Sequence, residues 1–160
     1  MKIGQSIDIH RLVVGRQLIL GGVEITNPVG LLGHSDADVL SHAIAEAIIG
    51  ALGKGDLGSW FSDNDEKNKN RNSLTILAEV KEMMIQAGYR IGNVDTLILL
   101  EEPKLQPYIF AMRQKIAEIL LCDISLINIK ATRGEGLGFI GRQEGAVASA
   151  VVLLKGKEDE

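Results

Sequence analysis

Residues 30–48 read GLLGHSDADVLSHAIAEAI, a short polar segment that runs into the first clear helix pattern of the chain. Apolar residues recur there at the spacing of one helix face, at positions 39, 40, 43, 44, 47 and 48, which is typical of a helix packed on a core. Asp36 or Asp38 can cap the first turn, because a carboxylate accepts hydrogen bonds from the free amides. We therefore predict a loop at residues 31–35 that leads into this helix.

Strand and helix patterns alternate on both sides of this helix. Residues 16–25 predict a hairpin with Gly21 and Gly22 in its tight turn, and residues 62–72 predict an exposed loop. The other strands are predicted at residues 1–10, 95–100, 127–131 and 146–154. The other helices are predicted at residues 73–87, capped by Ser73 and followed by Gly88, and at residues 108–121. This order indicates α/β or α+β layers, with helices on one face of a mixed sheet.

Length and charge exclude several classes of protein. The chain has 160 residues, with 17 Lys and Arg against 21 Asp and Glu, and a formal charge of −4. This mild acidity disfavours a nucleic-acid partner, and the single Cys122 excludes a disulfide framework or a Cys-based zinc finger. No apolar run approaches the roughly 18 residues of a membrane span, and the first residues lead us to expect no charged-then-apolar leader. We expect a single domain over residues 1–160, in the cytoplasm, without a nucleic-acid or membrane partner.

A carboxylate and two imidazoles are spaced as metal ligands can be. Asp8 and His10 lie two apart on a predicted strand, so their side chains share a face. His42 lies on the predicted helix, with Asp38 one turn before it. Three such ligands bind zinc and leave one position open for substrate or water. The spacing fits an ordinary surface strand and a helix histidine as well.

Two further segments have the chemistry of anion sites. His34 and Ser35 lie just before the helix, where free amides and the positive end of the helix dipole favour a phosphate. Residues 130–136, KATRGEG, follow an apolar strand without the spacing of a Walker A loop. Glu135 in this segment could bind a hard cation such as Mg²⁺. A capped loop and a solvated polar turn are the simpler interpretations of the two segments.

The motifs taken together are similar to one family. In chain order they are Ile3-Gly4, Asp8-Ile9-His10, GLLGHSDADVLSH at 30–42, GDLG at 55–58, Phe61 with Asp63-Asn64-Asp65, GNVD at 92–95, PKLQP at 103–107, KAT at 130–132 and LGFIGRQEG at 137–145. Over residues 1–155 they resemble the 2-C-methyl-D-erythritol 2,4-cyclodiphosphate synthase family of the non-mevalonate isoprenoid pathway.

The resemblance implies a ferredoxin-like α/β (α+β) fold with a mixed four-stranded sheet, helices on one face and a small hairpin. It also implies a homotrimer with an active site at each subunit interface. Asp8, His10 and His42 would hold Zn²⁺ or another divalent ion, and Asp38 would be a residue of the helix start. Mg²⁺ or Mn²⁺ would bind the substrate diphosphate near Glu135.

The implied enzyme is a phosphorus–oxygen lyase whose substrate is 4-diphosphocytidyl-2-C-methyl-D-erythritol 2-phosphate. The 2-phosphate attacks the β-phosphate, CMP leaves, and a cyclic diphosphate forms. Because the attacking phosphate is already ionised, the main obstacle is to bring several negative charges together in line. His34 and Arg133 would be the catalytic residues.

Substrate-binding roles follow from the same resemblance. Ser35 would join His34 on the phosphate, and Asp56 and Gly58 would hold the methylerythritol hydroxyls. Residues 61–65 would cover the substrate, and residues 100–106 with 131 and 132 would form the cytidine pocket of a neighbouring subunit. The full expected set is Ser35, Asp56, Leu57, Gly58, Phe61, Ser62, Asp63, Asn64, Asp65, Leu100, Glu101, Glu102, Pro103, Lys104, Leu105, Gln106, Ala131, Thr132, Glu135, Phe139 and Arg142.

Several positions depart from the family pattern. Arg133 stands where a Thr is usual, and it either replaces the hydroxyl with a charge-assisted contact or turns outward. Residues 5–7 read Gln-Ser-Ile instead of a His-Gly-Phe-like run, and Ser62 and Asn72 replace Pro and Asp. Two other functions stay open: a metal-dependent trimer that binds CDP or isoprenoid diphosphates with little turnover, and a zinc phosphohydrolase.

Overall fold

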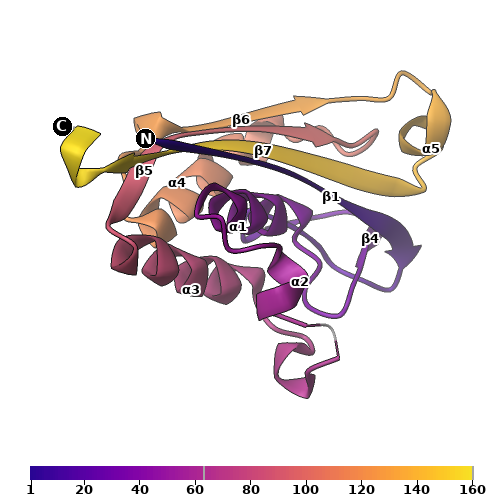
Figure 1. Ribbon diagram of the computed structural model, residues 1–160. Coiled ribbons are helices and arrows are strands. Elements are labelled where there is room, and N and C mark those ends of the chain that lie inside the picture. Colours follow the sequence, from indigo (N-terminus) through magenta and orange to yellow (C-terminus); the bar gives the residue numbers. More distant parts are fainter. Residues whose placement is uncertain (63, 160) are drawn as a thin grey trace.

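A five-stranded mixed sheet forms one layer of the protein in a computed structural model that describes residues 1–62 and 64–159 (Figure 1). The strand order is β4-β1-β7-β5-β6. Only β5 and β6 run parallel among these neighbours, and the other pairs are antiparallel. The strands are β1 (Lys2–Val14), β4 (Val29–Leu32), β5 (Tyr89–Leu99), β6 (Ile127–Thr132) and β7 (Gly145–Gly156).

The prediction of a four-stranded sheet is wrong by one edge strand. β1 continues past His10 to Val14, and this extension pairs with β4, as in Leu12 opposite Leu31. The first residues of the predicted 31–35 loop are therefore strand. The sequence pattern missed β4 because it has four residues, carries Gly30 and shows no regular alternation.

The long helices α1, α3 and α4 lie together on one face of the sheet, as the sequence predicts, whereas the short α5 lies at the end of the sheet between β6 and β7 (Figure 1). The most buried is α1, which has ten buried residues among its thirteen and packs on β1, β7 and α3. A helix that is apolar almost all round belongs inside a core. The helices are α1 (Val39–Ala51), α2 (Leu57–Trp60), α3 (Ser73–Gln86), α4 (Ile109–Leu120) and α5 (Gly138–Gly141).

Local capping confirms one expectation and corrects another. Asp38 is the N-cap of α1 and accepts a hydrogen bond from the Ser41 amide. The cap of α3, however, is Asn72, whose side chain accepts from the Leu74 amide, and Ser73 is already helical. The Ser73 hydroxyl is thereby free for the contacts described below.

The predicted hairpin is confirmed as β2 (Leu18–Leu20) and β3 (Val23–Ile25). Gly21 and Gly22 form its turn with φ of 55° and 71°, values that glycine reaches without the steric cost of a side chain.

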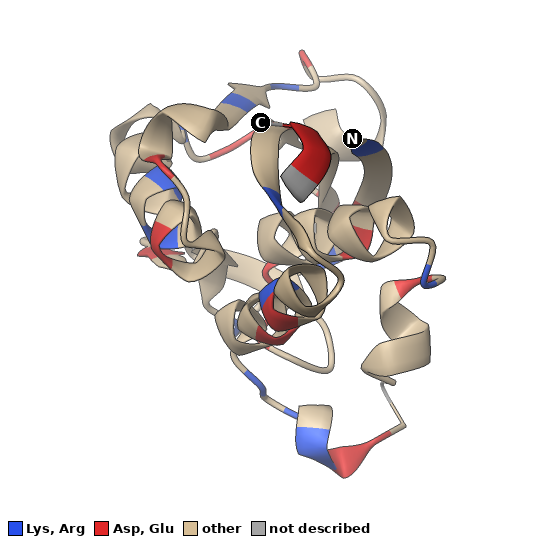
Figure 2. Ribbon diagram, turned by 60° about the vertical axis from the view of Figure 1, so that its left-hand side comes forward, with Lys and Arg blue, Asp and Glu red and all other residues tan. Residues whose placement is uncertain are grey.

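None of the helices among the described residues is long and apolar enough to cross a membrane. Acidic and basic residues are interspersed over helices and loops (Figure 2).

Gly4 sets how closely β1 approaches α1. A Cβ at this position would lie 1.9 Å from the Ala47 carbonyl oxygen and 2.8 Å from the Ala51 amide nitrogen. Both atoms belong to the backbone of a buried helix and cannot rotate away. Because β1 also carries Asp8 and His10, this close contact fixes the distance between the strand and helix that form the site.

We predict that Gly4→Ala destabilises the fold by about 3 kcal/mol or more, because the core must open to admit the methyl group. Gly50→Ala is the matched control, since a Cβ there meets nothing within 4 Å; this variant should gain about 0.5 kcal/mol from lower chain entropy and better helix propensity. Urea unfolding followed by circular dichroism measures both. Equal stability of the two variants would show that the close approach is not tight.

Candidate active site

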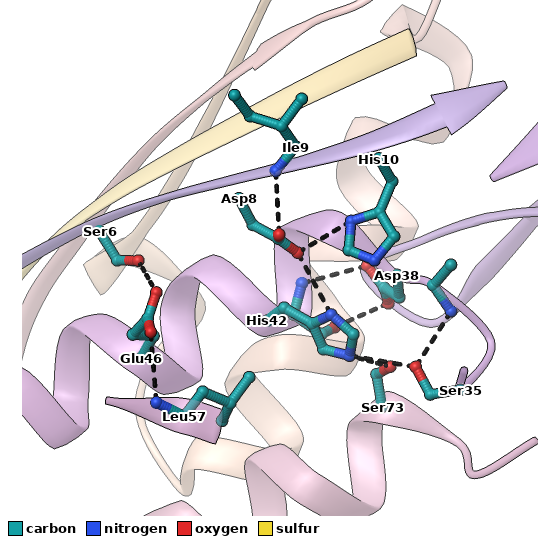
Figure 3. Close-up of polar contacts among 12 residues, drawn as sticks. Ser6, Asp8, Ile9, His10, Ser35, Asp38, His42, Glu46, Leu57 and Ser73 are labelled. Carbon is teal, nitrogen blue, oxygen red and sulfur yellow. Dashed lines mark hydrogen bonds and ion pairs between the residues drawn. The ribbon is translucent and has the colours of Figure 1, made fainter. Parts of the chain in front are cut away.

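Asp8, His10 and His42 converge between β1 and the first turn of α1 (Figure 3). Asp8 Oδ2 lies 3.2 Å from His10 Nδ1 and 3.2 Å from His42 Nδ1. One ligand atom from each residue lies within 4.8 Å of the other two. The structure therefore brings together the three residues that the sequence proposed as metal ligands, one carboxylate and two imidazoles.

The donor set fits a divalent metal ion. His10 Nδ1 is buried and makes no hydrogen bond, because its short distance to Asp8 lacks hydrogen-bond alignment. A buried imidazole nitrogen without a hydrogen bond is unfavourable unless it binds a proton or an ion. With Asp8 and His42 beside it, this nitrogen completes a set of three protein ligands, which is the number that leaves a position open on zinc.

Ser73 holds the far side of the His42 ring. Its hydroxyl donates to Asp36 in a short hydrogen bond and lies 2.8 Å from His42 Nε2. A hydroxyl that donates to a carboxylate has lone pairs left to accept the Nε2 proton. A neutral His42 ring with its proton on Nε2 would leave the Nδ1 lone pair on the side of Asp8, where a metal ion could bind it.

Neighbouring charges in this cluster shift the pKa values of Asp8 and His42. Burial acts to raise the pKa of Asp8, but the imidazoles of His10 and His42 outweigh it and hold the pKa well below its usual value. Burial acts in the opposite direction on His42, whose pKa is nevertheless raised by the carboxylates of Asp8, Asp38 and Asp36. The site thus holds a negative carboxylate that attracts positive charge.

The segment at His34 and Ser35 differs from the sequence expectation in one respect. Free amides at the helix start were expected to bind an anion, but three amides of this stretch already have partners: Ala37 donates to Ser35, Asp38 to Asp36 and Ser41 to Asp38. Among the described side chains here, His34 Nε2 is buried without a hydrogen bond. The His34 ring can therefore contact an anion beside the metal position through Nε2.

Arg16 lies behind this segment and was not singled out by the sequence. Its Nη2 donates to the carbonyls of Gly33 and Ser35, at 3.3 and 2.8 Å, and its Nε donates to Leu31. These bonds take three carbonyl oxygens of the segment and place a positive charge next to it. A lone arginine before a hairpin gives no sequence signal for such a role.

The first cavity, of about 500 Å³, joins the metal ligands to part of the expected substrate site. Glu46 also lines it and was missed: it accepts hydrogen bonds from Ser6 and from the Leu57 amide. Three expected residues do not line the cavity: Asp56 caps α2 by accepting from the Ser59 amide, and Asn64 and Asp65 are exposed. Asp63 lies outside the described residues. The expected site residues that line the cavity are Asp8, His10, His34, Ser35, His42, Leu57, Gly58, Phe61 and Ser62.

A second cavity of about 350 Å³ lies between the end of β6 and the residue 100–106 segment. It gathers most of the residues expected to bind cytidine, while Glu102, Glu135, Phe139 and Arg142 line neither cavity. Arg142 pairs with Glu144 instead. The expected residues that line it are Leu100, Glu101, Pro103, Lys104, Leu105, Gln106, Ala131, Thr132 and Arg133.

Glu101 connects this cavity to the turn that follows β6. Its carboxylate accepts from Arg133 Nη2 at 2.9 Å, from the Gly134 amide at 2.8 Å and from the Gly136 amide at 3.3 Å. Burial acts to raise the pKa of Glu101, but these bonds outweigh it and lower the pKa. Arg133 therefore does not turn away from the pocket; it is held at its edge.

Known proteins resemble this chain in both sequence and fold. The chain is 51% identical over 158 residues to the 2-C-methyl-D-erythritol 2,4-cyclodiphosphate synthase of Shouchella clausii, covering 99% of both chains. Its fold matches the bifunctional IspDF of Campylobacter jejuni (TM-score 0.93, 41% identity), over 97% of this chain and 42% of that one. It also matches a CDP complex of IspF from Plasmodium falciparum (TM-score 0.86, 35% identity), over 98% and 96%.

The fold and the site together define an α/β protein in which a carboxylate and two imidazoles that could hold a metal ion line one cavity. The sequence matches the YgbB family over residues 1–155. The chain belongs to the YgbB family.

We predict that Ser73→Ala weakens zinc binding by about 10- to 100-fold, the usual effect of removing a hydrogen bond that orients a metal-bound histidine. Isothermal titration with Zn²⁺ on metal-stripped protein measures this affinity. Ser125→Ala, on an exposed turn, is the control and should bind zinc as the unmodified protein does. Unchanged zinc affinity of Ser73→Ala would show that Ser73 does not orient His42.

The lowered pKa of Glu101 predicts a pH-dependent contribution to stability. A carboxyl group with a pKa below its unfolded value stabilises the fold above that value and loses the effect as the pH falls. Glu101→Gln should therefore have a lower Tm than the unmodified protein at pH 7, and the difference should shrink below pH 4.5, the ordinary pKa of Glu. Thermal unfolding at several pH values checks this; a constant difference would contradict it.

Proposed function

We propose that this chain acts as a 2-C-methyl-D-erythritol 2,4-cyclodiphosphate synthase in the non-mevalonate pathway to isoprenoid precursors. The observation that carries the proposal is the convergence of Asp8, His10 and His42 in a cavity that also contains His34 and Ser35. This arrangement occurs in a chain 51% identical, over almost its full length, to a synthase of that name.

The reaction joins two phosphates of one substrate. An oxygen of the 2-phosphate of 4-diphosphocytidyl-2-C-methyl-D-erythritol 2-phosphate attacks the β-phosphorus, and a new P–O bond forms. The bond between the β-phosphorus and the bridging oxygen breaks, and CMP leaves with that oxygen. No proton has to be removed from the attacking group, so orientation and charge are the main requirements.

Asp8, His10 and His42 would hold zinc or another divalent ion. Such an ion, when bound, screens the charge of a phosphate and fixes its orientation. Glu135 is exposed, and its carboxylate has no hydrogen bond among the described residues. We assign it to the Mg²⁺ or Mn²⁺ that accompanies the diphosphate, since carboxylate oxygen is a preferred ligand of these ions.

The residues of the first cavity would bind the attacking phosphate and the sugar. His34 Nε2 and the Ser35 hydroxyl would contact phosphate oxygens, with the charge of Arg16 behind them. Glu46 accepts a hydrogen bond from the Leu57 amide and would thereby hold the turn at residues 56–58 in place. We assign this turn to the binding of the methylerythritol hydroxyls. Phe61 and residues 62–65 would cover the substrate.

We also propose that the protein forms a homotrimer, in which the second cavity of one subunit supplies the cytidine pocket for the metal site of its neighbour. The face of the sheet opposite the helices supports this assembly, because Ile3, Ile7 and Ile9 of β1 are more than half exposed there, near the partly exposed Val151 of β7. A row of exposed apolar side chains is typical of a contact surface. Phe139 and Arg142 would lie near the threefold axis.

We predict that protein loaded with Zn²⁺ and Mg²⁺ releases CMP from the diphosphocytidyl substrate and that EDTA abolishes the release. His42→Ala should lose bound zinc and activity and retain its circular dichroism spectrum. Chromatography of the nucleotide product, elemental analysis and light scattering, which should give the mass of three chains, measure these outcomes. Ser125→Ala is again the control.

Three results would contradict the proposal. A folded, zinc-loaded trimer that binds CDP and releases no CMP would be a binding protein. Inorganic phosphate as the product would indicate a zinc phosphohydrolase. Stoichiometric zinc in His42→Ala would show that the ligand assignment is wrong.

A further inference from the structure

Glu101 has a stronger connection to the 133–136 turn than a pocket-lining residue needs. All three of its hydrogen-bond donors come from this one turn: the Arg133 guanidinium and the amides of Gly134 and Gly136. Glu135, between the two amides, has φ of 54°, and Gly136 has φ of 73°. Successive amides in such a turn form a concave donor site, and here a carboxylate of the chain itself fills it.

The Glu101–Arg133 pair is asymmetric in its burial. The Glu101 side chain is 7% exposed, whereas the Arg133 side chain is 53% exposed. Glu101 takes one hydrogen of Nη2, and the planar guanidinium has four further N–H donors. The buried carboxylate therefore fixes the direction of a guanidinium that still faces open space.

The charge balance at the second cavity favours an anionic group on its ligand. Arg133 and Lys104 both line the cavity, and Glu101 is the acidic residue of its lining. Both Glu101 oxygens already accept hydrogen bonds from the turn, so the carboxylate has little capacity to bind a ligand. The charged side chains of this lining that can donate hydrogen bonds to a ligand are thus Arg133 and Lys104.

We propose that Glu101 is a positioning residue that aims Arg133 at a phosphoryl oxygen of the nucleotide bound in this cavity, so that the pocket prefers a nucleoside diphosphate to the nucleoside alone. The proposal rests on the proposed function only in that a cytidine nucleotide binds here. An arginine pre-oriented by a carboxylate loses less freedom on binding a phosphate than a mobile one.

The test compares two probes, CDP and cytidine, by isothermal titration against the intact assembly. Arg133→Gln should lower the affinity for CDP about tenfold, the usual effect of one charge-assisted hydrogen bond, and leave cytidine within about twofold. Gln is preferred to Thr because the Thr hydroxyl could itself bind phosphate. Glu101→Gln should lower the affinity for CDP about fivefold by releasing the guanidinium, again with little effect on cytidine.

The double variant separates positioning from general support of the pocket. If Glu101 acts through Arg133, the double variant binds CDP about as weakly as Arg133→Gln alone. Two independent contributions would multiply, to about fiftyfold, and would overturn the proposal. An equal loss of cytidine and CDP affinity in Glu101→Gln would also overturn it, since it would mean that Glu101 only maintains the pocket. Glu118→Gln, on the exposed face of α4, is the matched control.

If Glu101→Gln fails to fold, Arg133→Lys tests the same idea without changing Glu101. Lysine keeps the charge but lacks the planar fork that Glu101 fixes, so it should recover less than half of the tenfold loss. Full recovery would show that charge alone matters. CMP release by the unmodified protein is measured separately: its absence, with these affinities intact, would reject the proposed function and leave this inference standing.

Discussion

The geometry of the metal-ligand cluster depends on the hydrogen bonds that the buried Asp38 carboxylate accepts. The side chain is fully buried and accepts four hydrogen bonds: from the amides of Gly21 and Gly22 and from the amide and hydroxyl of Ser41, at 2.7–3.0 Å. Burial raises its pKa although the four donors oppose this. One residue thereby joins the hairpin turn to the start of α1.

The position of every group around the metal cluster follows from this junction. Once α1 starts at Val39, His42 lies in its first turn and reaches Asp8 of β1. The short segment before Asp38 then has to carry Ser35 and Asp36 past the His42 ring, where Ser73 closes the contact from α3. Elements separated by more than thirty residues are thus brought to one imidazole.

The acidic charge of the chain takes on a chemical meaning at this site. A protein with a net charge of −4 is proposed to bind a substrate with three phosphoryl groups. Arg16 contributes from behind its segment, and Arg133 is held by a carboxylate. Divalent ions would therefore supply most of the countercharge, with aimed arginines adding selectivity more than total charge.

The sequence by itself determined the helix that follows Asp38 and the glycine turn of the hairpin, because helix periodicity and glycine conformation are local properties. It also offered Asp8, His10 and His42 as candidate ligands, and the fold brings these three side chains together. The tertiary structure decided the edge strand β4 and the partners of Ser73, Glu46 and Glu101. Their roles depend on which distant residue each one meets: Ser73 meets Asp36 and His42, and Glu101 meets the turn after Thr132. Hydrogen bonds between residues far apart in the chain leave no periodic pattern in the sequence, so only the three-dimensional structure shows them.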